Sequence, residues 1–500
     1  MIDVGLPRES ALWTMLPQPL RVTAAVLTGI GIAAVIAYLT ATGHPELALG
    51  LLLAVPAAQV AVKYPLSAMV LWLVAASFVV ETSGGGMRMV FWLIHRAAPP
   101  LAVLNLVVAE GLGAIPRLPR LSRAEAMMAG YVAITELSIV FTSSTVVLSS
   151  WRLYDRVVVP MCLYLLVRLV QPEERQLRRV LPILALVLLA QTVIGVTQWV
   201  APGALPGAWV TRAGMRTTGS LAQPGVYTVT MLTAGLLLLH IGMQQRHRLG
   251  GRLAVWLFPL ALVMTFMTYS RASWLAGLIV VLGLFTCYPR FVTKLAAAAI
   301  VVVVALLASG AIQTQVQLAQ ARFLSEGSER SALSRLPVMA ASVRMLQRKP
   351  LTGWGFDSFD EYDRQFQGSV GGLMVPEKDH SSHSLYLTIL AEQGVPGFLL
   401  YMGPFAYWLV RSRRVRMTMP VDGVISRKLL LALWLMLVAH IVVNNYANMR
   451  IEWGLGLWWA TLGLLASFVV RYDPFEMARA AQEEELDAAG SEVDPGTVTP

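Results

Sequence analysis

The sequence predicts an all-α polytopic membrane protein with about 12–14 transmembrane helices. Two observations carry this prediction: hydrophobic residues make up 56% of the 500-residue chain, and charged residues make up only 14%. A soluble domain carries about 25% charged residues, which keep its surface in water. A transmembrane β-barrel is excluded, because its strands alternate polar and apolar residues, whereas stretches such as Leu295–Ser309 are apolar on all sides.

Apolar runs of roughly membrane-spanning length follow one another along the chain. They lie near residues 20–41, 46–62, 65–81, 88–110, 126–143, 155–170, 178–200, 224–243, 252–269, 272–288, 294–312, 384–410, 427–447 and 452–471. The run at 88–110 contains Arg88, Arg96 and the pair Pro99-Pro100. It could therefore be a re-entrant or interfacial segment rather than a span.

Lysine and arginine are concentrated in alternate loops between these runs. Cytoplasmic loops of membrane proteins carry the excess of basic residues, so this alternation predicts an even number of spans with both termini inside. The formal net charge of +10 is explained in the same way, and no nucleic-acid partner is expected. The predicted cytoplasmic loops hold Lys63, Arg117, Arg120, Arg123, Arg175, Arg178, Arg179, Arg246, Arg248, Arg252, Arg290, Lys294, Arg411, Arg413, Arg414 and Arg416. Most basic residues of the opposite loops are Arg152, Arg212, Arg216, Arg271 and Arg450.

Two segments lie outside the pattern of spans. Residues 313–383 form a long polar loop, which the alternation places on the outer side. In this loop, apolar residues recur at helical spacing, which predicts an amphipathic helix that lies on the membrane or caps the bundle. These residues are Leu333, Leu336, Met339, Val343 and Leu346. The acidic tail 472–500 is predicted to be a disordered cytoplasmic end.

Polar groups gather at the predicted outer ends of the helices, and few ionisable residues lie deep within the apolar runs. The outer loop 211–220 carries Arg212 and Arg216 beside two threonines and a glycine, a combination that can hold an anion. Arg271 follows a tight outer turn and begins the next helix, whose free N–H groups favour a phosphate. The alternatives are an ordinary interfacial loop and a snorkelling arginine.

Two histidines precede the run at 384–410, in the segment His380-Ser-Ser-His383-Ser384. At the N-terminus of a helix the dipole disfavours imidazolium and pushes His383 towards its neutral form. A neutral imidazole accepts a proton from a sugar hydroxyl, as a general base must. A structural histidine is the alternative. His380 could join His383 on a metal, but the sequence places no third ligand, so no metal and no other cofactor are expected.

Four motifs between residues 210 and 400 occur in an order that one known family shares. They are Arg216-Thr-Thr-Gly219, Thr268-Tyr-Ser-Arg271, Arg348-Lys-Pro-Leu-Thr-Gly-Trp-Gly355, and His383-Ser384 followed after nine residues by Gly394-Val-Pro-Gly397. In these motifs the sequence resembles the O-antigen ligase and bacterial polysaccharide polymerase superfamily. The likeness includes Leu385-Tyr-Leu-Thr-Ile-Leu-Ala-Glu392 and departs at Gln223-Pro224-Gly225, where relatives often have Asn-Pro-Asn.

The resemblance implies a glycosyltransferase C-like membrane protein of the bacterial inner membrane, with one large periplasmic loop and an active site that faces the periplasm. It implies metal-independent, inverting transfer of a glycan from undecaprenyl diphosphate to an acceptor hydroxyl on lipid A–core or a growing polysaccharide. Arg216 and Arg271 would then stabilise the departing lipid diphosphate, and His383 would deprotonate the acceptor. Further substrate-binding residues would be Arg212, Arg348, His380 and Glu392, the last with a structural role as its alternative.

This hypothesis divides the chain into N-terminal transmembrane helices (1–200), a catalytic region with the periplasmic loop (201–410), C-terminal transmembrane helices (411–471) and the tail (472–500). Two other functions remain open. A polysaccharide polymerase, for O-antigen or exopolysaccharide, would use the same motifs at the same site. A lipid-glycan transporter is the third, and the scarcity of charged residues at mid-depth speaks against it.

Overall fold

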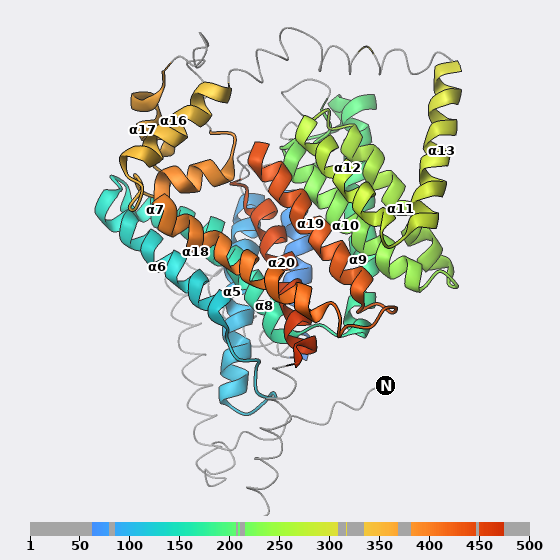
Figure 1. The fold of residues 1–500 in the computed structure, drawn as a ribbon, viewed down its shortest axis with the longest axis horizontal. Helices are drawn as coiled ribbons and strands as arrows, with labels where there is room; N and C mark the ends of the chain where they lie inside the picture. Colours follow the sequence, from blue (N-terminus) through green and yellow to red (C-terminus); the bar gives the residue numbers. More distant parts are fainter. Residues whose placement is uncertain are drawn as a thin grey trace, which may run out of the picture.

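The described part of the chain is all-helical (Figure 1). The computed structural model describes residues 63–79, 86–206, 209–210, 216–308, 317, 335–368, 382–446 and 450–474. The expected spans at 20–41 and 46–62 and nearly all of the tail 472–500 lie outside these residues, as do most of 309–334 and all of 369–381 in the long polar loop.

Each apolar run that falls within the described residues coincides with a helix. The helices are α4 (Ser67–Val79), α5 (Gly86–Gly111), α6 (Arg123–Thr142), α7 (Val146–Leu153), α8 (Val159–Val170), α9 (Glu174–Val200), α10 (Pro224–Gln244), α11 (Leu249–Phe266), α12 (Arg271–Phe285), α13 (Pro289–Ala308), α16 (Arg335–Arg348), α17 (Phe359–Phe366), α18 (Leu385–Val415), α19 (Arg427–Tyr446) and α20 (Glu452–Tyr472). Among the described helices, α6, α9, α10, α11, α19 and α20 are long and apolar enough to cross a membrane. The protein is therefore a polytopic membrane protein.

Helices α10 and α20 form the centre of the bundle, because both are buried along almost their whole length. Around α20, Trp72 of α4 stacks on Trp453 with ring centroids 4.8 Å apart, and Trp459 meets Tyr164 of α8 edge-on at 6.1 Å. The outer helices instead expose large apolar side chains, for example Trp256 of α11. Such outward apolar surface suits contact with lipid and would be unfavourable in water.

Helix α5 continues through Pro99 and Pro100, so the re-entrant alternative for this run does not hold. A proline inside a helix removes an N–H donor and leaves the carbonyl four residues earlier without its helical partner. For Pro100 that carbonyl belongs to Arg96, and the Tyr154 hydroxyl donates to it at 2.6 Å. The structure thus replaces the lost hydrogen bond from a neighbouring helix.

The expected run at 155–170 belongs to a longer helical stretch. It begins with α7 at Val146 and continues through a π-helical turn at Tyr154–Val158 into α8. The run at 384–410 is helical, but it consists of two segments, because Gly394 has a non-helical backbone (φ 65°, ψ −171°). Hydrophobicity alone did not show this break, since apolar residues flank it on both sides.

The helix expected within the polar loop is α16. Its predicted inner face was wrong: Leu336 and Val343 are exposed, at 43% and 41% of their surface. Val338, Ala341 and Met345 are buried instead, and Val338 and Met345 form a cluster with Phe359 of α17 and Ala391 of α18. Two apolar stripes are present on this helix, and periodicity could not show which one packs.

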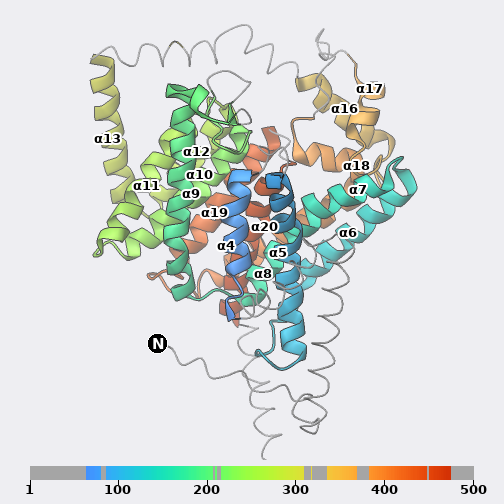
Figure 2. The same cartoon turned by 180° about the vertical axis from the view of Figure 1, so that it is seen from behind.

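The described loops predicted to be cytoplasmic all lie at one end of the bundle, the lower end in Figures 1 and 2. Contacts between them agree: Arg411 pairs with Asp473, and Arg471 donates to the carbonyl of Gln171. The starts of α10, α12, α18 and α20 lie at the upper end with α16 and α17 (Figure 1). The alternation of basic residues thus separates the two ends of the described bundle.

We expect residues 313–383 to face the periplasm and residues 411–426 the cytoplasm, because the arginines of 411–416 should remain inside. Glu361→Cys and Met417→Cys both place a thiol at an exposed position, in a background with Cys162 and Cys287 replaced by serine. A membrane-impermeant thiol reagent on intact spheroplasts should label Glu361→Cys alone. Labelling of Met417→Cys alone would reverse the orientation.

Candidate active site

His383 lies directly before α18, and a hydrogen-bonded turn surrounds it. The following residue, Ser384, is the N-cap, whose hydroxyl accepts from the N–H of Leu387. The Ser382 hydroxyl donates to the Ser384 carbonyl at 2.8 Å and bonds Thr388, and the Ser384 hydroxyl donates to Asn445 Oδ1 at 3.3 Å. The half-buried His383 has a φ of 52°. A non-glycine residue in this left-handed region costs about 1–3 kcal/mol, and the turn must offset that strain.

The motif at 348–355 packs against the break in α18 and completes its hydrogen bonds. The N–H groups of Trp354 and Gly355 donate to the carbonyls of Ala391 and Glu392, at 3.1 and 2.8 Å. Helix ends leave such carbonyls without intrahelical partners. On the other side of the break, Val395 N–H donates to the Pro350 carbonyl at 2.8 Å. Two motifs that are separate in sequence therefore form one interlocked unit.

Glycine is required at this junction for two reasons. Gly353 has a φ of 64°, and a Cβ there would collide with the backbone of Glu392. Gly394 has a φ of 65°, and a Cβ there would lie 2.6 Å from the Pro350 carbonyl oxygen. The strand of chain at 350–355 can thus approach the helix end only because both contact points lack a side chain.

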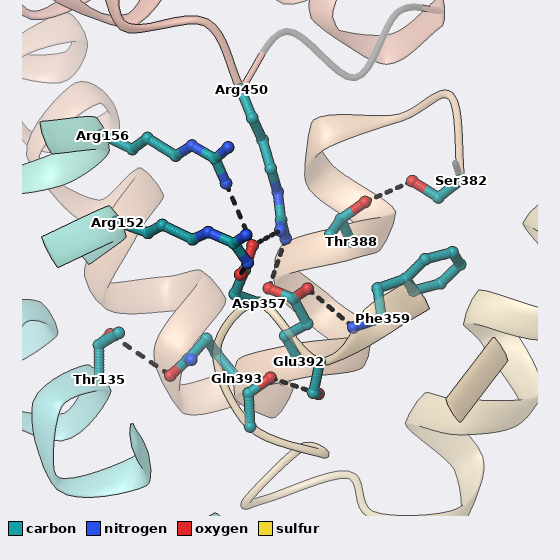
Figure 3. Close-up of polar contacts among 12 residues, drawn as sticks. Thr135, Arg152, Arg156, Asp357, Phe359, Ser382, Thr388, Glu392, Gln393 and Arg450 are labelled. Carbon is teal, nitrogen blue, oxygen red and sulfur yellow. Dashed lines mark hydrogen bonds and ion pairs between the residues drawn. The ribbon is translucent and has the colours of Figure 1, made fainter. Parts of the chain in front are cut away.

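Asp357 is the centre of an ion network beside this junction (Figure 3). Its carboxylate pairs with Arg152 from α7, with Arg156 from the π-helical turn (3.1 Å) and with Arg450 from the start of α20 (3.2 Å). Arg450 also pairs with Glu392. Burial opposes the charge of Arg450, but the carboxylates of Glu392 and Asp357 outweigh it and raise the pKa of the guanidinium.

Glu392 is buried, with 1% of its side chain exposed, and both of its carboxylate oxygens are bonded. Arg450 binds Oε2, and the Phe359 N–H donates to Oε1 at 3.2 Å (Figure 3). These contacts suit the structural alternative for Glu392, because a carboxylate committed to two protein donors has little capacity left for a substrate. Arg348 ends α16 at an exposed position on the same side of the molecule.

The loop at 216–220 is fixed by side chains of α9. Gln198 accepts from the N–H groups of Thr218 and Gly219 (3.0 and 3.1 Å) and donates to the Gly219 carbonyl (2.8 Å). Trp199 donates to the Thr217 hydroxyl at 2.7 Å. The two threonines are at most 2% exposed. They therefore hold the loop in place rather than offer their hydroxyls to an anion, which corrects that part of the sequence interpretation.

Arg216 and Arg271 come from neighbouring segments. The Thr217 N–H, directly after Arg216, donates to the carbonyl of Met267 at 3.2 Å, four residues before Arg271. Arg271 is exposed and begins α12 after the N-cap Ser270, as the sequence predicted. Both arginines lie at the same end of the bundle as His383 (Figure 1). Arg212 and His380 lie outside the described residues.

Comparison with known families gives one match. Residues 256–402 match the family model described as O-antigen ligase. The chain carries an O-antigen ligase domain. No curated protein matches the chain. The O-antigen ligase domain extends from α11 through the first part of α18 and includes Arg271, Arg348, Asp357, His383 and Glu392.

Several site residues were missed by sequence analysis. Asp357 follows the Trp-Gly-Phe of the 348–355 motif, and its left-handed backbone (φ 62°) was not visible in the sequence. Arg152 and Arg450 had been recognised only as basic residues of outer loops, and Arg156 had not been considered. Arg152, Arg156 and Arg450 all lie outside the O-antigen ligase domain, so the domain's own motifs could not indicate them.

We expect Gly394→Ala to destabilise the protein by about 1–3 kcal/mol or more, because the new Cβ meets the Pro350 carbonyl at a positive φ. Thermal unfolding of the purified protein measures the change. Gly250→Ala is the control, since a Cβ at Gly250 has no neighbour within 4 Å and the backbone is not left-handed. Equal unfolding temperatures for the two variants would contradict the interlocked junction.

Proposed function

We propose that the protein transfers a glycan from undecaprenyl diphosphate to an acceptor hydroxyl at the outer face of the bacterial inner membrane. The observation that carries the proposal is the match of 256–402 to the O-antigen ligase family, together with the position of its histidine motif. That motif is folded into a fixed turn, at the same end of the bundle as Arg216 and Arg271 (Figure 1). The transfer is of the O-antigen ligase type, without a metal and with inversion.

In the proposed reaction His383 is the general base. The imidazole takes the proton of the acceptor hydroxyl while its oxygen attacks the anomeric carbon of the donor glycan. The new carbon–oxygen bond forms on the face opposite the bond to the diphosphate, which breaks, so the configuration at the anomeric carbon inverts. The fixed turn supports this role, because general-base catalysis needs the base within hydrogen-bond reach of the proton that it accepts.

Arg216 and Arg271 stabilise the leaving group in this proposal. Negative charge accumulates on the lipid diphosphate as the glycosidic bond breaks, and cationic donors placed beforehand stabilise such a transition state. Arg271 is well suited, because the free N–H groups at the start of α12 add to its positive charge. Arg348 and Arg212 would help to hold donor or acceptor. A polysaccharide polymerase would use the same chemistry with a growing glycan as acceptor.

His383→Ala should lower the rate of transfer by about 10²–10⁴-fold, the usual cost of losing a general base. The assay uses purified protein with an undecaprenyl-diphosphate-linked glycan, an acceptor and a chelator. His247→Ala, at the opposite end of the bundle, should be unaffected, and His380→Ala should lose far less than His383→Ala. Full transfer by His383→Ala, or loss of wild-type activity in the chelator, would sink this mechanism.

Arg271→Lys should lose most of the transfer activity while its expression stays normal. Lysine keeps the positive charge but lacks the planar pair of donors that binds a phosphate with two hydrogen bonds. Arg290→Lys is the matched control, because Arg290 is an exposed residue at the start of α13, at the other end of the bundle. Wild-type turnover in Arg271→Lys would leave Arg271 as an interfacial anchor.

A further inference from the structure

Arg450 links the part of α18 that carries His383 to the rest of the bundle. It bonds Glu392 through Nη2 and Asp357 through Nη1, and Asp357 is held in turn by Arg152 and Arg156 (Figure 3). We propose that Arg450 is a positioning residue for glycan transfer, which fixes the helical segment 385–393 and thereby the imidazole of His383. This inference rests on the proposed function, because it requires a reaction at His383.

The segment 385–393 acts as a short rigid rod between two points of attachment. One end is fixed by the bond from the Ser384 hydroxyl to Asn445 of α19, and the other by the pair of Glu392 with Arg450. Nine helical residues are about 13 Å long, so a tilt of about 5° at one end moves the other by about 1 Å. A displacement of this size at a reacting group can cost about 10²-fold in rate.

Arginine is needed at position 450 because one side chain has to hold two carboxylates at once. The planar guanidinium directs two separate nitrogens at fixed angles, whereas lysine has a single nitrogen on a flexible stem. The outer arginines are less decisive. Arg152 is 44% exposed and contacts Asp357 alone among the two carboxylates, so water can replace much of its contribution.

The C-terminal helices then contribute directly to the site. Arg450 lies outside the segment 256–402 that matches the O-antigen ligase family, at the junction of α19 and α20. Its distance along the chain from Glu392 is 58 residues, and from Asp357 it is 93 residues. The network therefore couples the position of His383 to the packing of α20, the most deeply buried candidate span among the described helices.

The test compares Arg450→Lys with a matched pair elsewhere in the same protein. Arg411 pairs with Asp473 at the opposite end of the bundle, and these two side chains are 18% and 9% exposed, the same values as Arg450 and Asp357. Arg411→Lys therefore weakens an ion pair of equal burial without touching the site. Both variants are purified at full length, and their unfolding temperatures, kcat and KM for the lipid-linked donor are measured.

We expect similar losses of unfolding temperature in the two variants, but a kcat lowered by about 10–100-fold in Arg450→Lys alone, with KM unchanged. Equal kcat values would overturn the inference, and so would a raised KM with kcat retained, which would indicate substrate contact. If Arg450→Lys does not fold, Asp357→Asn decides by the same criteria, because it leaves the pair of Glu392 with Arg450 in place.

A second measurement separates this inference from the proposed function. The rate at which diethyl pyrocarbonate modifies His383, followed by mass spectrometry, needs no substrate. Arg450→Lys should change this rate relative to the wild type and to Arg411→Lys. An unchanged rate would overturn the positioning of His383 by Arg450. Absence of transfer by the wild type, with the modification rate still altered, would count against the proposed function alone.

Discussion

The break in α18 at Gly394 is the constraint on which the rest of the candidate site depends. In a bundle that faces lipid, backbone groups have to find their partners within the protein. The break frees the carbonyls of Ala391 and Glu392, and the segment that carries Gly353 and Gly355 supplies the missing N–H donors. That segment must therefore lie against the break. Asp357 follows it by two residues, so the same requirement brings a carboxylate into the interior beside Glu392.

Two neighbouring buried carboxylates then require positive partners, since an unpaired buried charge is strongly unfavourable. The structure meets this requirement with arginines from distant parts of the chain: Arg152 and Arg156 before the O-antigen ligase domain and Arg450 after it. The site is thus assembled by the whole described bundle. A single family motif positions the backbone, and residues outside that motif complete the electrostatics.

The sequence was sufficient for the helices, because long apolar runs have few alternatives in a membrane. It also placed Arg271 at a helix start and His383 directly before one. It could not show the partners of Asp357, since Arg152 is 205 residues away and nothing in local spacing marks the contact. The break in α18 was hidden within an apolar run, and the inner face of α16 was misassigned because that helix has two apolar stripes.

Backbone strain is concentrated at the candidate site. Among the described residues, the non-glycine residues with positive φ are Gln171, Ala222, Tyr269, Asp357 and His383. Gln171 caps the end of α8, which is an ordinary place for this conformation. The others lie beside the Arg216 loop, the Arg271 turn, the ion network and the start of α18. Each costs about 1–3 kcal/mol and persists only where its surroundings hold it. For His383 and Asp357 those surroundings are the serine turn and the three arginines. Stability provided elsewhere in the bundle must offset this strain. A site held in one arrangement before substrate arrives is what the proposed transfer needs, because fixed charges stabilise a departing diphosphate without reorganising during the reaction.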